Sequence, residues 1–467
     1  MIFFLITTIL FLLAGFLFMK KYDLKQWLIY LIIFSSPLIV YRYNLPPGGF
    51  NLTFMRIFLM AGLLALLVTF VIKKDLLFQF DKKVWLLFGL FIFYFLYKIM
   101  NGLKTENSFY SIRQLFIIFS AGLVLFVIPY YINTEEKYKT AVKAFLASCI
   151  IPMLIGIYRL FMYYVVNKRV AIPFQQFIQY GPQSNNMTGM QGFGYGELYI
   201  ARVMSTLGSS PYYGEYLVYM IAMMIPFILF KKGYLKWSGL SLAVINLLLL
   251  VNTYSRSSWL LLIISCLIYM VYLVIQKKTL VVIRYTLVAL VSVTVLFFMT
   301  PAKYQEYLIR RSTDLFDNKT MSTMGHIQTR GKAIEFFKSS PLTGIGLGNF
   351  GVRLHQSPAT SSSHAFLLTE LAEGGLIGFL LLLTFLSLMV YSTIRVFLQT
   401  DKNSGLRLYL LGISVTLTLF FINNIIIYDT LFRDTSIIIM ALCVSAINIA
   451  GIKGNDKTRS VHHHSVL

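Results

Sequence analysis

The chain has 467 residues, of which 57% are hydrophobic and 13% are charged, and its mean hydropathy is +0.72. This composition excludes an ordinary soluble domain, in which about 25% of residues are charged. The formal net charge of +23 does not indicate a nucleic-acid partner, because the Lys and Arg residues are scattered in short groups between apolar segments.

Cysteine and histidine usage argues against disulfides and metal sites. Cys149, Cys266 and Cys443 lie singly in apolar segments without the paired spacing of a disulfide framework or a CxxC site. The terminal VHHHSVL has three adjacent His residues but no acidic or Cys partner, so we interpret it as a polar tail. The sequence therefore predicts no metal site.

Apolar segments long enough to cross a membrane recur along the whole chain. A spanning helix needs about 20 predominantly apolar residues, which here predicts an all-α, polytopic membrane protein with about 12–13 transmembrane helices. The first segment lacks the basic start and polar cleavage region of a signal peptide, so we expect it to be retained. The segments begin near Ile2, Leu24, Leu52, Val84, Ile112, Thr140, Tyr212, Tyr234, Ser257, Leu280, Leu376, Leu406 and Leu431.

The distribution of Lys and Arg predicts which loops face the cytoplasm. Every second loop is basic, and basic loops stay on the cytoplasmic side of the cytoplasmic (inner) membrane. The N-terminus is therefore predicted outside and the C-terminus inside. The basic loops contain Lys20 and Lys21, Lys73 and Lys74, Lys137 and Lys139, Lys231 and Lys232, Lys277 and Lys278, Lys402 and Arg407, and Lys453 and Lys457.

This topology divides the chain into four parts. We expect a transmembrane region over 1–299 with an outer loop at about 167–210, a large extracytoplasmic loop over 300–363, a C-terminal transmembrane region over 364–452 and a cytoplasmic tail over 453–467.

The large outer loop has helical composition from Thr320 to Phe337, where Ile327, Ala333 and Phe337 can face the membrane domain. The following PLTGIGLGNFG is a poor nucleotide loop, because no strand precedes it and it lies outside. We expect its glycines to let the backbone fold closely over the mouth of the membrane domain.

Two arginines at the predicted outer face are candidates for anion binding. Arg202 precedes a Gly-Ser-Ser-Pro turn, and Arg256 lies in the tight polar hairpin TYSRSS between two apolar runs. The planar donor fork of Arg matches phosphate oxygens. The alternatives are an arginine that reaches interfacial water at Arg202 and an ion pair with a nearby carboxylate at Arg256.

His364 follows three serines and precedes an apolar helix. Ser361 to Ser363 are good N-cap residues for a short helix that starts at His364 and ends at Gly374 and Gly375. A histidine at a helix N-terminus is favoured in its neutral, basic form. With two arginines nearby, it could accept a proton from a hydroxyl that attacks a diphosphate-linked sugar.

Four stretches together resemble the O-antigen ligase and polymerase superfamily of bacterial membrane glycosyltransferases. They are RVMSTLGSSPYYGEYL from Arg202, SRSSWLLLI around Arg256, RGKAIEFFKSSPLTGIGLGNF from Arg330 and HAFLLTELAEGGLIGFLLLL from His364. The first 200 residues carry only weak likeness, and the additional N-terminal apolar segment departs from the family pattern.

The resemblance implies a type C glycosyltransferase fold that uses undecaprenyl-diphosphate-linked glycans without a cofactor or metal ion. It implies diphosphate binding by Arg202 and Arg256, a catalytic role for His364 at the acceptor hydroxyl, and a further basic position at Arg330. Glu373 is a supporting candidate that could orient a partner or pair with a loop arginine.

Three functions are compatible with these features. We favour a polysaccharide polymerase, for capsule, exopolysaccharide, O-antigen or teichuronic-type polymer, whose partners would be lipid-linked donor and acceptor, membrane lipid, a flippase and a chain-length regulator. An O-antigen ligase that transfers glycan to lipid A core needs the same diphosphate site. A transporter of an anionic solute or glycolipid is the alternative from another class, although inverted repeats are not evident.

Overall fold

The computed structural model describes residues 23–45, 50–73, 80–166, 191–195, 198–281, 321–354, 365–402, 404–426 and 431–464, with isolated positions at 170, 283, 287, 298, 305, 306 and 309. The predicted spans near Ile2 and Leu280 fall largely outside these residues, as does His364.

Nine helical segments within the described residues are long and apolar enough to cross a membrane, which confirms the predicted all-α, multi-pass membrane fold. Two shorter apolar helices, α2 (Leu24–Ser35) and α3 (Phe54–Lys73), occupy the positions of two more predicted spans. The nine segments are α4 (Lys82–Gly102), α5 (Ser108–Tyr131), α6 with α7 (Glu135–Ala147 and Ile150–Tyr164), α9 (Ser210–Phe230), α10 (Tyr234–Val251), α11 (Arg256–Ile275), α16 (Phe366–Gln399), α17 (Arg407–Ile426) and α18 (Asp434–His464).

Three helices form the centre of the bundle. The spanning parts of α9, α17 and α18 are 78%, 72% and 83% buried, whereas α10 and α11 are only 22% and 28% buried. Large apolar side chains such as Trp237 on α10 and Ile263 on α11 point outward. Such an apolar exterior is favourable in a bilayer, where lipid replaces water around the outer helices.

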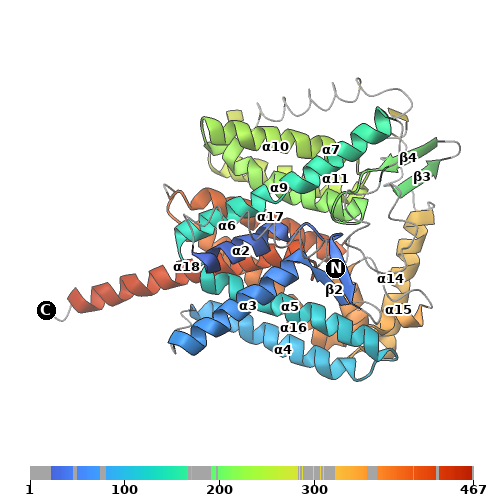
Figure 1. Cartoon of the computed structure of the whole chain (residues 1–467), viewed down its shortest axis with the longest axis horizontal. Helices are drawn as coiled ribbons and strands as arrows, with labels where there is room; N and C mark the ends of the chain where they lie inside the picture. The colour runs from blue at the N-terminus through green and yellow to red at the C-terminus, as the bar shows by residue number, and fades with distance from the viewer. Residues whose placement is uncertain are drawn as a thin grey trace.

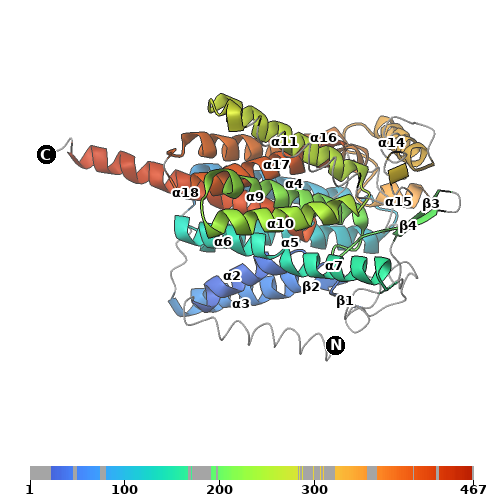
Figure 2. The ribbon, with the colours of Figure 1, turned by 90° about the horizontal axis from the view of Figure 1, so that it is seen from above.

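The two β-hairpins gather at one end of the bundle (Figures 1 and 2). β1 (Arg42–Leu45) pairs with β2 (Phe50–Thr53), and β3 (Gln191–Tyr195) pairs with β4 (Leu198–Arg202), both antiparallel. Helices α14 (Met321–Ser339) and α15 (Asn349–Arg353) lie at the same end. This end bears the loops that the charge pattern predicts to be outside, and we call it the loop end.

The helix predicted from Thr320 to Phe337 is confirmed as α14, with bounds that differ by one residue at its start and two at its end. Its packing differs from the prediction. Ala333 is fully buried against Phe350 and Ala372, but Ile327 is 52% exposed and Phe336, not Phe337, completes the contact. The segment has almost no amphipathic pattern, so its sequence does not specify which face of the helix is buried.

Candidate functional site

Arg202 and Arg256 lie at one junction of the loop end. β4 ends at Arg202, whose Nε donates a hydrogen bond to the carbonyl oxygen of Thr253 at 2.8 Å. The next backbone N–H, of Val203, donates to the carbonyl of Asn252 at 3.0 Å. Arg256 begins α11 only three residues after Thr253. The structure therefore joins two segments that the sequence identified separately.

The turn between α10 and α11 is held in a sparsely populated conformation. Tyr254 has a positive φ of 48°, which is uncommon for a residue with a large side chain, and only 3% of it is exposed. Next to it, the hydroxyl groups of Ser255 and Ser258 lie 2.8 Å apart. A Cβ atom on Gly214 of α9 would come within 2.4 Å of the Ser258 hydroxyl, so this glycine permits the close approach. The surroundings thus hold the turn that leads into Arg256 in a defined shape.

A third arginine, which sequence reasoning did not select, belongs to the same junction. Arg159 lies on the inner face of α7 and is 1% exposed. Its Nη1 donates to the carbonyl oxygen of Met204 at 2.6 Å, two residues beyond Arg202. The sequence feature that could have identified Arg159 is its position as a single Arg within the apolar run IIPMLIGIYRLFMYY. An ionisable residue within a span is a default candidate for function.

His364 lies outside the described residues, and Ala365 next to it is described. Helix α16 begins at Phe366 with Ala365 as its N-cap, so the predicted start at His364 with a serine cap is wrong by two residues. Ala365 has no side chain that could cap the helix, and its carbonyl oxygen accepts from the backbone N–H of Leu368 and Thr369.

The predicted break at the glycine pair is confirmed. Gly375 has φ 61° and ψ −165°, values outside the helical region that divide α16 into an entrance segment, Phe366–Gly374, and the long span that follows. A Cβ atom at Gly375 would lie 2.4 Å from the backbone nitrogen of Gly344. Glycine is therefore required at this position by both conformation and space.

The loop PLTGIGLGNFG, residues 341–351, which we call the glycine-rich loop, packs closely on the entrance segment, as predicted. Backbone N–H groups of Ile345 and Gly346 donate to the carbonyls of Ala372 and Glu373, at 3.0 and 3.1 Å. In the opposite direction, the N–H of Leu376 donates to the carbonyl of Pro341 at 2.8 Å. The loop thus supplies partners for backbone groups that the break in α16 releases.

The two glutamates of the entrance segment have different partners. Glu370 is buried and forms an ion pair with Lys98 of α4. Glu373 accepts a hydrogen bond from the backbone N–H of Phe350, in the first turn of α15, at 3.1 Å. In the structure Glu373 therefore holds the first turn of α15, while its role in the site stays a prediction.

Arg330 lies on α14, one turn before the buried Ala333. Ala333 packs on Ala372 of the entrance segment, so Arg330 is located near that segment on a half-buried face of α14. Arg330 is thus close to the entrance segment of α16, whose residues follow His364 in the chain.

A buried carboxylate on α9 was also missed by sequence reasoning. Glu215 is 2% exposed, and its Oε1 has no hydrogen-bond partner among the described residues. It lies five residues after the first residue of α9, near the loop end. The sequence feature that could have identified Glu215 is its position as the single charged residue of the stretch GEYLVYMIAM.

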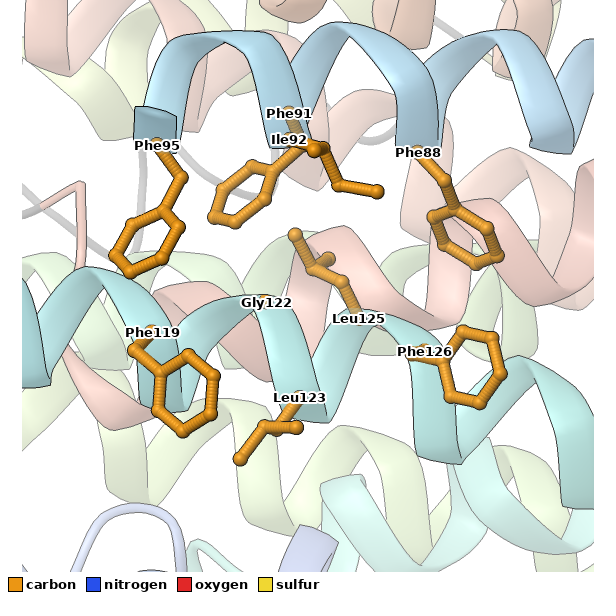
Figure 3. A pocket seen from close by; sticks show the side chains of 9 residues that line it. All are labelled: Phe88, Phe91, Ile92, Phe95, Phe119, Gly122, Leu123, Leu125 and Phe126. Carbon is orange, nitrogen blue, oxygen red and sulfur yellow. The ribbon is translucent and has the colours of Figure 1, made fainter. Parts of the chain in front are cut away.

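The apolar pocket between α4 and α5 is separate from these charged groups (Figure 3). Phe88, Phe91, Ile92 and Phe95 line it from α4, and the remaining residues come from α5. The pocket has almost no polar surface and offers nothing to bind or activate an anionic group. The candidate site residues described above all lie outside this pocket.

The fold and these residues define a multi-pass helical membrane protein with buried charged groups concentrated at one end. Residues 241–383 match the family model described as O-Antigen ligase. Over this segment the chain is similar to the O-antigen ligase and polymerase superfamily. The matched segment includes Arg256, Arg330 and Glu373, whereas Arg159 and Arg202 precede it. Comparison with curated proteins gives no match.

Proposed function

We propose that this protein is a surface-polysaccharide polymerase of the bacterial cytoplasmic membrane. It would transfer a glycan chain from undecaprenyl diphosphate to the next lipid-linked repeat unit on the extracytoplasmic face. The observation that carries the proposal is the contact of Arg202 Nε with the Thr253 carbonyl, because it joins Arg202 to the turn that opens with Arg256. The guanidinium groups of these two residues would suit the charge of a diphosphate.

The proposed reaction is a displacement at the anomeric carbon of the donor. The acceptor hydroxyl forms the new glycosidic bond, and the bond between the anomeric carbon and the diphosphate oxygen breaks. Undecaprenyl diphosphate leaves with the bonding electron pair, so negative charge grows on it in the transition state. Arg202 and Arg256 would stabilise that charge, and His364 would accept the proton of the attacking hydroxyl. Because arginines neutralise the diphosphate, the proposed reaction needs no metal ion.

A reconstituted assay tests this function. Purified protein in lipid is given lipid-linked repeat units, and products are resolved by glycan length. We expect a ladder of longer glycans with stoichiometric release of undecaprenyl diphosphate. Passage of intact lipid-linked substrate across the bilayer without a change in glycan length would support a transporter and contradict the proposal.

The same assay separates a polymerase from a ligase. When both a lipid-linked repeat unit and lipid A core are offered as acceptors, a polymerase extends the repeat unit. A ligase attaches glycan to lipid A core and leaves the repeat unit unextended. Activity that depends on a flippase or a chain-length regulator in cells, but not in the reconstituted assay, would identify these proteins as pathway partners.

A further inference from the structure

The guanidinium group of Arg159 is buried with most of its donor capacity unused. Of its five N–H bonds, those on Nη1 face the Met204 carbonyl, while Nε and Nη2 have no hydrogen-bond partner among the described residues. No described carboxylate lies within ion-pair distance of it, since the charged pairs of the loop end involve other residues. Within the part of the chain that the structure describes, Arg159 is thus a buried cation without a counter-ion in a membrane-spanning segment.

Such an arrangement costs free energy, because burial removes water from a charge without replacing it by a counter-ion. Two other buried cations of the bundle, Lys98 and Arg56, differ in this respect. Lys98 contacts Glu370 at 2.9 Å, and Arg56 contacts Asp434 at 3.5 Å. An anion that binds at this position would explain why Arg159 lacks a carboxylate partner among the described residues, whereas Lys98 and Arg56 each have one.

The location of Arg159 indicates where that anion would come from. Met204, which Arg159 contacts, lies two residues from Arg202 in the same extended segment. One turn and a residue further along α7, the Tyr164 hydroxyl lies 3.5 Å from the Asn252 side chain, at the start of the turn that precedes Arg256. The loop-end half of α7 therefore packs on both segments that hold the two candidate diphosphate ligands.

We propose that Arg159 is a third cation of the diphosphate site and binds the anionic diphosphate of the lipid-linked donor together with Arg202 and Arg256. This inference rests on the proposed function and names a binding residue that lies outside the matched family segment. A guanidinium pinned by one N–H to a backbone carbonyl keeps its remaining donors oriented, which lowers the cost of ordering it when the anion binds.

The alternative role for Arg159 is structural: its only task would be to hold the Met204 carbonyl. The two roles predict opposite effects of substitution on stability. Removal of an uncompensated buried charge stabilises the ligand-free protein, whereas removal of a required structural contact destabilises it.

The test compares Arg159→Met and Arg159→Lys with Arg353→Met in purified, lipid-reconstituted protein. Arg353 is the matched control, because it lies at the same end but is partly exposed and already paired with Glu106. Thermal unfolding midpoints are measured without ligand and with inorganic pyrophosphate, and affinity is measured for the lipid-linked donor. The two ligands separate recognition of the diphosphate itself from recognition of the lipid or glycan.

We expect Arg159→Met to raise the midpoint of the ligand-free protein, to reduce its stabilisation by pyrophosphate, and to weaken donor binding about tenfold or more, the loss typical of one charge-assisted contact. Arg159→Lys should bind donor with intermediate affinity, and Arg353→Met should match the wild type. Unchanged donor affinity in Arg159→Met, at any thermal midpoint, would overturn the inference.

If Arg159→Met does not fold, Arg159→Lys decides the question, and donor affinity equal to the wild type then counts against a binding role. The proposed function fails separately, namely if the wild-type protein binds the donor but never lengthens a glycan. If the wild-type protein lengthens glycans but the Arg159 variants bind the donor as tightly as the wild type, the inference about Arg159 is rejected and the proposed function is retained.

Discussion

The ammonium group of Lys98 lies 2.9 Å from Oε2 and 3.1 Å from Oε1 of Glu370, and the two side chains are 1% and 4% exposed. The Tyr94 hydroxyl donates a third hydrogen bond to this carboxylate at 3.1 Å. A Cβ atom at Gly374 or Gly378 would lie 2.3 or 2.6 Å from Glu370 Oε1, so these glycines make room for it. The pair fastens the entrance segment of α16 to α4.

Substitution of one partner of this pair should destabilise the protein strongly. Lys98→Met leaves the Glu370 carboxylate buried without its counter-ion, a change that costs about 3–5 kcal/mol of folding free energy in buried pairs. The expected result is a large fall in the thermal unfolding midpoint of the purified protein.

The double variant Lys98→Met with Glu370→Leu should recover most of that loss, because no uncompensated charge remains. Breaking the exposed pair of Arg353 and Glu106 by Arg353→Gln is the control and should cost no more than about 1 kcal/mol. A Lys98→Met protein as stable as this control would show that the buried pair contributes little.

A methyl group at Gly375 should disrupt the closure of the glycine-rich loop. Gly375→Ala places a Cβ atom 2.4 Å from the Gly344 nitrogen and requires a positive φ of 61° from a residue that disfavours it. The expected result is faster amide hydrogen exchange at Ile345 and Gly346, together with reduced activity. Gly331→Ala on α14 is the control: nothing lies within 4 Å of its Cβ position, and alanine should stabilise this helix by about 1 kcal/mol.

Substitution of the diphosphate ligands should separate binding from chemistry. Arg256→Ala should weaken donor binding and abolish elongation, and Arg256→Lys should also be poorly tolerated because an ammonium lacks the bidentate fork. His364→Ala should abolish elongation while donor affinity stays close to the wild type, since the histidine acts on the acceptor. Donor affinity and initial elongation rate are measured on the same preparations, and full activity in any variant excludes that residue from the site.

The fold class and the break in α16 were predictable from the sequence because each depends on local features. Long apolar runs specify spanning helices, and paired glycines interrupt them. The start of the entrance helix could not be predicted in this way, because a serine caps a helix only where the tertiary structure lets the backbone turn. Ala365, with no capping side chain, begins the helix instead.

The partners of charged residues were the least predictable part of the candidate site. Glu370 and Lys98 are 272 positions apart, and nothing local to either indicates the other. The importance of Arg159 was not predicted for the same reason. The partner of a single Arg in an apolar run is not evident from the sequence, because it depends on how α7 packs against the segment after β4. Arg202 and Arg256 were predicted because each is a charged residue shortly before or at the start of a spanning helix, close to a turn.

The role of Glu373 can be decided by an isosteric substitution. Its Oε1 accepts the Phe350 N–H at 3.1 Å, and a glutamine can accept the same bond through its amide oxygen. If Glu373 only holds α15 in place, Glu373→Gln should retain nearly full elongation activity. Glu373→Ala, which removes the acceptor, should lose about 1 kcal/mol of stability. Loss of activity in Glu373→Gln at unchanged thermal midpoint would instead mean that the carboxylate charge itself takes part in the reaction.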